Sequence, residues 1–210
     1  MMNASDVIAN LASMSEPLSV MVEPSSAPMP SDESLIAGMR SGQTAAGEAL
    51  VQRYYLPLIR YLQRLTGDVS LAEEMHQQTW LSVLEHLEKF EASGKTGATS
   101  GFKSWLFRIA TNKANDYWRA VGREKAVKDS LRLATDHEQP PADSRIEATE
   151  QAQKLHAAIR QLPENQRQVL LLRYYSELKF SEIAEVVGCP LSTALGRMHK
   201  AMLRLKELMV

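Results

Sequence analysis

The side chains of residues 102–128 are of the types that bind a nucleic-acid strand. The segment holds seven Lys or Arg residues against two acids, a net charge of +5, although the whole chain has a formal net charge of −1. Its basic residues are Lys103, Arg108, Lys113, Arg119, Arg123, Lys125 and Lys128. A cationic segment of this length favours binding to a phosphate backbone. A solvated helix face is the alternative interpretation.

The same region carries groups suited to unpaired bases. Asn112 and Asn115 offer hydrogen-bond donors and acceptors to base edges, and Trp118 offers a plane on which a base can stack, for about 1–3 kcal/mol. Phe90 and Phe102 flank the Gly-rich stretch "EASGKTGATSG". They are either further stacking planes or anchors for the ends of that loop.

A second candidate for DNA reading is "FSEIAEVVGCPLSTALGRM", which fits two helices joined by a turn at Gly188. The residues expected to pack these helices are Ile183, Ala184, Val187, Ala194 and Met198. The residues then left toward a major groove are Ser192, Thr193, Leu195, Gly196 and His199. Helical hairpins with a Gly turn also occur in proteins that never bind DNA, so the pattern alone is moderately specific.

Arg197 has two interpretations. It contacts phosphate, or it pairs with Glu182 or Glu185 on the preceding helix and fixes the angle of the hairpin. His199 and Lys200 are better candidates for DNA contacts.

Other kinds of site are poorly supported. The single Cys189 excludes an internal disulfide and a cysteine-based zinc cluster, and it is expected to be a small packing residue. The five His residues are scattered without metal-ligand spacing, and "GKTGATSG" lacks the first Gly of a phosphate-binding loop. We therefore expect no catalytic site, metal or cofactor. No apolar run approaches the roughly 20 residues of a membrane span, and the start does not resemble a signal peptide, so we expect a cytoplasmic protein.

The elements that position these groups are predicted to be helices throughout. Leu50, Tyr54, Leu58, Tyr61 and Leu65 follow helical spacing up to Gly67, and Pro57 either bends or breaks that helix. The next helix is expected to bury Leu71, Met75, Leu84 and Leu87 beside Trp80, and the one after it Trp105, Leu106 and Ile109. Ser31 or Asp32 is expected to cap the first helix, and Pro163 to occupy the first turn of a later one.

Composition divides this all-α chain into two small domains joined by a flexible linker. The predicted parts are a disordered acidic tail at 1–30, a helical domain at 31–125, a polar linker at 126–146 and a helix-turn-helix domain at 147–210. Residues 1–34 and 68–91 each carry a net charge of −5. The second of these segments would suit a basic protein partner.

Two long motifs resemble one family. "LPENQRQVLLLRYYSELKFSEIAEVVGCPLSTALGRMHKAMLRL" resembles the fourth conserved domain of bacterial sigma factors. "AEEMHQQTWLSVLEHLEKF" followed by "FKSWLFRIATNKANDYWR" resembles their second domain. Having only these two domains, in this order, resembles the extracytoplasmic-function (ECF) group of the sigma-70 family.

The resemblance implies a dissociable sigma factor that binds core RNA polymerase and recognises and melts promoter DNA. The implied polymerase contacts are Glu73, Glu74, Gln77 and Gln78. The implied minus-ten contacts are Phe90, Lys95, Phe102, Arg108, Asn112, Lys113, Asn115, Trp118, Arg119 and Arg123. The implied minus-thirty-five contacts are Ser192, Thr193, Leu195, Gly196, Arg197, His199 and Lys200. An anti-sigma protein is a further implied partner.

Some residues depart from the family pattern. The family commonly has an acid at Leu71, Gln-Glu at Gln77 and Gln78, and Lys at Leu195, and its capture loop is shorter. Three alternatives therefore stay open: a stand-alone helix-turn-helix regulator, a sigma-like protein that has lost polymerase binding, and a small helical enzyme.

Overall fold

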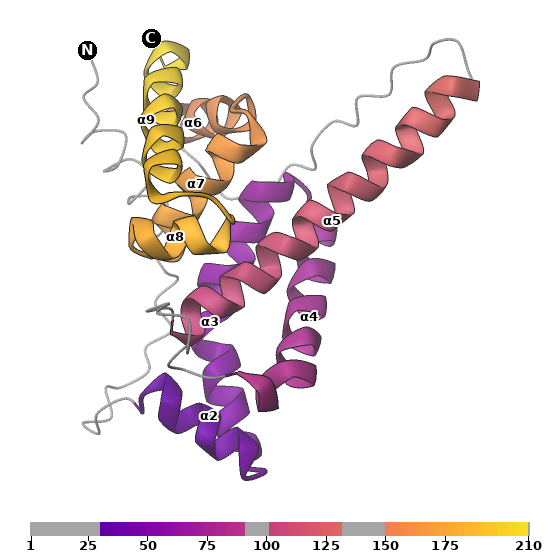
Figure 1. Cartoon of the computed structure of the whole chain (residues 1–210). Coiled ribbons are helices and arrows are strands. Elements are labelled where there is room, and N and C mark those ends of the chain that lie inside the picture. Colours follow the sequence, from indigo (N-terminus) through magenta and orange to yellow (C-terminus); the bar gives the residue numbers. More distant parts are fainter. Residues whose placement is uncertain (1–29, 91–100, 132–149, 210) are drawn as a thin grey trace.

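The computed structural model of the chain describes residues 30–90, 101–131 and 150–209, and every regular element in these ranges is a helix (Figure 1). The N-terminal bundle consists of α2 (Asp32–Arg40), α3 (Thr44–Thr66), α4 (Val69–His86), the short 3-10 helix η1 (Leu87–Lys89) and α5 (Phe102–Leu131). The C-terminal bundle consists of α6 (Glu150–Arg160), α7 (Glu164–Tyr175), α8 (Phe180–Val186) and α9 (Leu191–Leu208). The predicted all-α fold in two small domains is confirmed.

The central helix of the N-terminal bundle is α3. Leu50, Leu58 and Tyr61 are fully buried on it, as their helical spacing predicts. Pro57 lies inside the helix without ending it, and Gly67 ends it in the left-handed conformation at φ 74°. The Tyr61 hydroxyl bonds the hydroxyl of Thr111 on α5 at 2.8 Å, which joins the two helices through a buried contact.

The inward face of α4 differs from the predicted one. Met75, Thr79 and Val83 are buried, whereas Leu84 is 57% exposed and Leu71 is only partly buried. The buried positions recur every three or four residues, and Leu84 falls one step beyond that stripe. The prediction that Leu84 packs in the core is therefore wrong.

Contacts of α2 fix the entrance to the bundle and the start of the Gly-rich loop. The Ser31 side chain caps α2 by accepting a hydrogen bond from the backbone N–H of Ser34 at 3.2 Å. At the other end, the Arg40 guanidinium donates to the carbonyl oxygens of Leu87, at 2.7 Å, and of Phe90. Arg40 thereby holds the chain where the loop begins, a role that its position in the sequence did not indicate.

The C-terminal bundle has the predicted helix-turn-helix. Ile183, Ala184 and Ala194 are buried between α8 and α9, and Gly188 makes the turn at φ 64°. Two details are corrected. Val186 is buried more deeply than the predicted Val187. Pro163 is the residue that caps α7 rather than part of its first turn.

Helix α5 extends further than the sequence predicted. It continues to Leu131, past the expected start of the linker at 126, and it projects beyond the bundle in Figure 1. Residues 1–29, 91–100 and 132–149, with most of the predicted tail, loop and linker, lie outside the described residues.

Two negative observations apply to the described ranges alone. None of the helices there combines the length and hydropathy that crossing a bilayer would take. Nor do His, Cys, Asp and Glu side chains gather in those ranges in a group able to hold a metal ion.

The two bundles are in direct contact, α3 against α7 and α5 against α8. The Gln168 side-chain amide on α7 donates to the side-chain oxygen of Asn115 on α5. The Arg64 guanidinium on α3 donates to Nδ1 of His156 on α6 at 3.0 Å. Polar groups on the surface of one domain thus bond to polar groups of the other.

Candidate nucleic-acid and polymerase surfaces

A groove between the end of α4 and the first half of α5 gathers several predicted nucleic-acid contacts. It has a volume of about 440 Å³ and is lined by Ser82, His86, Lys89, Phe90, Trp105, Arg108, Ile109, Asn112, Lys113 and Asp116. Arg108 and Asn112 are exposed at its surface, and Lys113 is half-buried. Cations, an amide and aromatic rings therefore line one hollow, as binding an unstacked base requires.

The aromatic residues at the loop ends are anchors in this structure. Phe90 is 7% and Phe102 2% exposed. Their rings pack edge to face with centroids 5.8 Å apart, and Trp105 lies 4.7 Å from Phe90. A ring buried in this cluster has no free face for a base. The interpretation of Phe90 and Phe102 as stacking planes is corrected to that of loop anchors.

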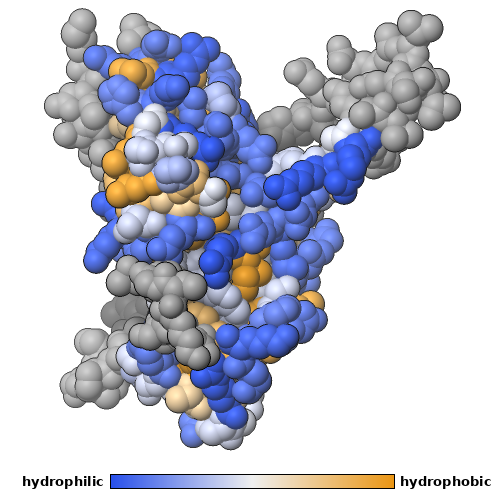
Figure 2. Space-filling view, viewed as in Figure 1, coloured by the Kyte–Doolittle hydropathy of each residue, from blue (hydrophilic) through white to orange (hydrophobic). Residues whose placement is uncertain are grey.

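The remaining basic candidates lie apart from the groove. Arg119 is exposed and pairs with Asp116 at 3.1 Å, and Arg123 is exposed further along α5. Figure 2 shows hydrophilic residues along the projecting part of α5. Lys95 lies outside the described residues.

Asn115, Trp118 and Arg119 face the C-terminal bundle. They line a pocket of about 620 Å³ together with Pro163, Glu164, Asn165, Gln168 and Arg197. The pocket thus brings three predicted minus-ten residues next to one residue of the predicted minus-thirty-five helix. Trp118 is half-buried here, so its ring is only partly free.

The outer face of α9 carries most of the predicted duplex contacts. The exposed members are Ser192, Thr193, Leu195, Gly196, His199 and Lys200. Arg197 is half-buried, and no ion pair joins it to Glu182 or Glu185 within the described part of the chain. Glu182 instead accepts a hydrogen bond from the backbone N–H of Lys179 at 2.7 Å. The predicted pairing that would fix the hairpin is absent from this structure.

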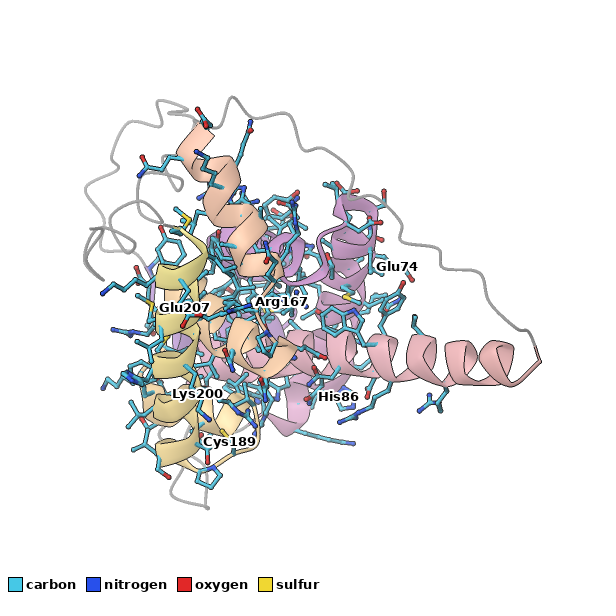
Figure 3. All side chains as sticks on the ribbon, turned by 90° about the horizontal axis from the view of Figure 1, so that it is seen from above. Glu74, His86, Arg167, Cys189, Lys200 and Glu207 are labelled. Carbon is cyan, nitrogen blue, oxygen red and sulfur yellow. The ribbon has the colours of Figure 1, made fainter. Side chains whose placement is uncertain are left out.

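The predicted polymerase contacts lie together on the exposed side of α4. Glu73, Glu74, Gln77 and Gln78 are all exposed, and the Gln78 amide donates to the Glu74 carboxylate at 2.9 Å. Figure 3 shows Glu74 at the edge of the N-terminal bundle, on the side away from α9 and Lys200.

Sequence reasoning missed an apolar extension of this surface. Leu81 is 59% and Leu84 57% exposed, one turn further along α4. Leu84 also borders an apolar groove of about 780 Å³ between α2, α3 and α4, whose lining includes Met39, Val51 and Tyr55. The signal was present in the spacing, because Leu81 and Leu84 follow Gln77 and Gln78 at helical intervals.

Two His residues are held neutral. Burial lowers the pKa of His76, whose Nε2 accepts a hydrogen bond from the Trp80 indole at 3.2 Å. At the contact between the bundles, burial and the neighbouring Arg64 and Arg160 guanidinium groups lower the pKa of His156 to about 4. The His156 Nδ1 accepts from Arg64, so its proton is on Nε2, which is buried without a hydrogen-bond partner.

Comparison with known families matches both bundles. The model for "Sigma-70 region 2" matches residues 50–124, and the model for "Sigma-70, region 4" matches residues 152–205. The chain is 28% identical over 183 residues to the RNA polymerase sigma-H factor of Pseudomonas aeruginosa, an alignment that covers 81% of this chain and 89% of the relative. It is 28% identical over 163 residues to the ECF RNA polymerase sigma factor SigM of Bacillus subtilis, covering 77% and 93%.

Solved structures show the same fold. The sigma factor RpoE from Bartonella quintana, in complex with the anti-sigma factor NepR, aligns with a TM-score of 0.57 and 25% identity, over 76% of this chain and 95% of that one. CnrH in complex with the cytosolic domain of CnrY aligns with a TM-score of 0.61 and 22% identity, over 84% and 96%.

Proposed function

The chain belongs to the ECF group of the sigma-70 family, and from this premise we propose how its surfaces serve promoter recognition. It is a dissociable sigma factor that binds core RNA polymerase and directs transcription initiation. The observation that supports this function most strongly is that sigma-70 regions 2 and 4 occur in order on two helical bundles, each of which exposes candidate contact residues.

In the proposed division of labour, residues 31–125 form the domain that binds polymerase and the melted minus-ten element. Glu73, Glu74, Gln77, Gln78 and the adjacent Leu81 contact the polymerase clamp. Arg108, Asn112 and Lys113 line the groove that receives a minus-ten base, while Lys95, Arg119 and Arg123 contribute further contacts to the strand. Residues 147–210 form the second domain, whose α9 lies in the major groove of the minus-thirty-five duplex.

Promoter binding requires the two domains to separate. The names of the two elements place them about 25 base pairs apart, or ~85 Å at about 3.4 Å per base pair. In this structure Asn115, Trp118 and Arg197 line one pocket. Residues this close together cannot contact both elements at once. We propose that binding to polymerase holds the domains apart, and that this tethering raises the affinity of each for its element.

Three further assignments belong to the same proposal. The family is not one of enzymes, and we assign no catalytic role to this chain. Its work with polymerase places it in the bacterial cytoplasm. An anti-sigma protein is a proposed partner, since relatives of the same fold have been solved with such proteins bound.

Run-off transcription tests the proposed function. Bacterial core polymerase would be mixed with the purified chain on DNA from upstream of its own gene, with core binding followed by co-migration on a sizing column. We expect a discrete transcript that depends on the chain. Failure to bind a cognate core would contradict the proposal and favour a stand-alone DNA-binding regulator. Binding without transcription would point to a different promoter, and templates with random promoter sequences would then be used.

A further inference from the structure

The first turns of α9 expose apolar side chains where a DNA-reading helix usually presents polar ones. Leu191 is 47% and Leu195 45% exposed, and they lie one helical turn apart. Exposed Leu side chains are common singly, but these two are adjacent on the helix that the proposed function places in a major groove.

Gly196 follows Leu195 and has no role in the folded domain. Its φ is not in the left-handed region, and a Cβ added there would meet nothing within 4 Å. A Gly inside a helix destabilises it by about 1 kcal/mol relative to Ala. Neither backbone conformation nor internal packing explains this residue, so the space that it leaves opens only outward.

The polar residues around this pair narrow what it can read. Ser192 and His199 are exposed on the same side, while Arg197 is half-buried at the pocket between the domains. The centre of the face therefore lacks the Arg or Lys that most often binds a guanine edge. The apolar feature that a major groove offers is the 5-methyl group of thymine, which Ala, Thr and Phe side chains contact in other proteins.

We propose that Leu195 packs against a thymine methyl in the minus-thirty-five element and that Gly196 allows the helix backbone to approach the base edges closely. This inference rests on the proposed function, and it makes Leu195 and Gly196 specificity-determining residues. The element then contains a thymine that is read through its methyl group rather than by hydrogen bonds.

The first experiment defines the element. Core polymerase with this chain would transcribe a template library randomised over both promoter elements, and enriched templates would be sequenced. Enrichment of a two-part promoter supports the proposed function. Absence of any enrichment while the chain binds core would remove that function and this inference with it.

The second experiment tests the inference alone. Each thymine of the selected minus-thirty-five element would be replaced singly by deoxyuridine, which lacks the methyl group, and holoenzyme affinity would be measured. At one position we expect binding to weaken about three- to fivefold, as for loss of one buried methyl group. In Leu195→Ala, deoxyuridine at that position should change affinity by less than about 1.5-fold, whereas Leu195→Met should retain the sensitivity.

Leu203→Ala is the matched control, because Leu203 is 50% exposed further along α9. It should respond to deoxyuridine like the unaltered chain. If no thymine is sensitive, or if Leu195→Ala remains as sensitive as the unaltered chain on a promoter that is still transcribed, the inference is wrong and the proposed function stands.

Gly196→Ala gives a test with effects of opposite sign. The substitution should raise the thermal midpoint of the free chain by about 2–4 °C, because Ala favours the helix. It should weaken minus-thirty-five binding at least threefold, because the added methyl group faces the groove. Gly122→Ala is the control, since a Cβ at exposed Gly122 also meets nothing within 4 Å, and it should leave minus-thirty-five discrimination unchanged. Higher stability with unchanged affinity in Gly196→Ala would contradict the proposed close approach.

Discussion

At the scale of single residues, burial separates the side chains that can bind a base from those that cannot. Phe90 and Phe102 have the residue type of a stacking platform, yet both rings are enclosed in an aromatic cluster. Asn112 and Arg108 are exposed at the adjacent groove. The amide and basic residues of α5 are therefore better candidates for base and phosphate contacts than the aromatic residues at the loop ends.

Asn112→Ala is expected to impair promoter melting. Removing the amide loses hydrogen bonds to a base edge in the groove, and we expect run-off transcription to fall about tenfold, the effect of 1–2 kcal/mol. Core binding should be unchanged, because Asn112 lies apart from the exposed side of α4. Glu207→Ala, at the exposed C-terminal end of α9, is the control. Equal loss in both variants, or loss of core binding, would contradict the assigned role.

Leu81→Asp is expected to weaken core polymerase binding by about tenfold or more. Leu81 is 59% exposed beside Gln77 and Gln78, and a carboxylate buried at an interface loses its hydration. The free chain should keep its helicity and thermal midpoint. Leu203→Asp, an equally exposed position on α9, should bind core normally. Unchanged core affinity in Leu81→Asp would remove Leu81 from the polymerase surface.

At the scale of elements, the fold depends on close approach between neighbouring helices. Gly38 on α2 is buried, and a Cβ there would lie 2.8 Å from the Cβ of Ala46 on α3. The same amino acid thus has opposite significance in two helices, because Gly38 is required by packing and Gly196 is not.

Gly38→Ala should destabilise the N-terminal bundle by about 1–3 kcal/mol, the usual cost of overpacking. The gain in helix propensity, about 1 kcal/mol, offsets part of that loss. Urea unfolding of the full chain would measure the change against Gly196→Ala, which is expected to be stabilising. A stabilised Gly38→Ala variant would show that α2 can move away from α3 without cost.

At the scale of the whole molecule, the contact between the domains opposes the arrangement that promoter binding requires. Gln168 bonds Asn115, and Arg64 bonds His156. His156 must be neutral to accept this bond. The contact is therefore expected to depend on pH.

We expect the domains to separate as the pH falls. The pKa of His156 is about 4 in the closed contact and near 6.5 when it is exposed, so the open form binds a proton first. The contribution of this contact is fully present above about pH 6.5 and is lost as the pH falls toward about 4. Energy transfer between dyes on the two domains would decrease over that range.

His156→Asn is the control for this prediction. Its neutral amide does not titrate, so the pH dependence of energy transfer should flatten between about pH 6.5 and 4. His76→Asn should not flatten it, because His76 lies within the N-terminal bundle, away from the contact. An unchanged pH profile in His156→Asn would assign the titration to another group.

The sequence by itself determined the features that depend on local spacing and residue type. Helical periodicity in α3, the turn at Gly188 and the cationic composition of α5 were sufficient for the all-α fold, the helix-turn-helix and the nucleic-acid hypothesis. These features arise from contacts between residues close together in the chain, and the motifs that resemble sigma factors are local in the same sense.

Tertiary structure alone decided which faces are free. It buried Phe90 and Phe102, exposed Leu84, connected Arg40 to the start of the loop and placed Asn115 against Gln168. Each outcome depends on partners from 12 to 53 positions away in the chain, and helical periodicity contains no information about such partners. Residue type therefore predicted what each side chain can bind, and packing between distant helices decided whether it is free to do so.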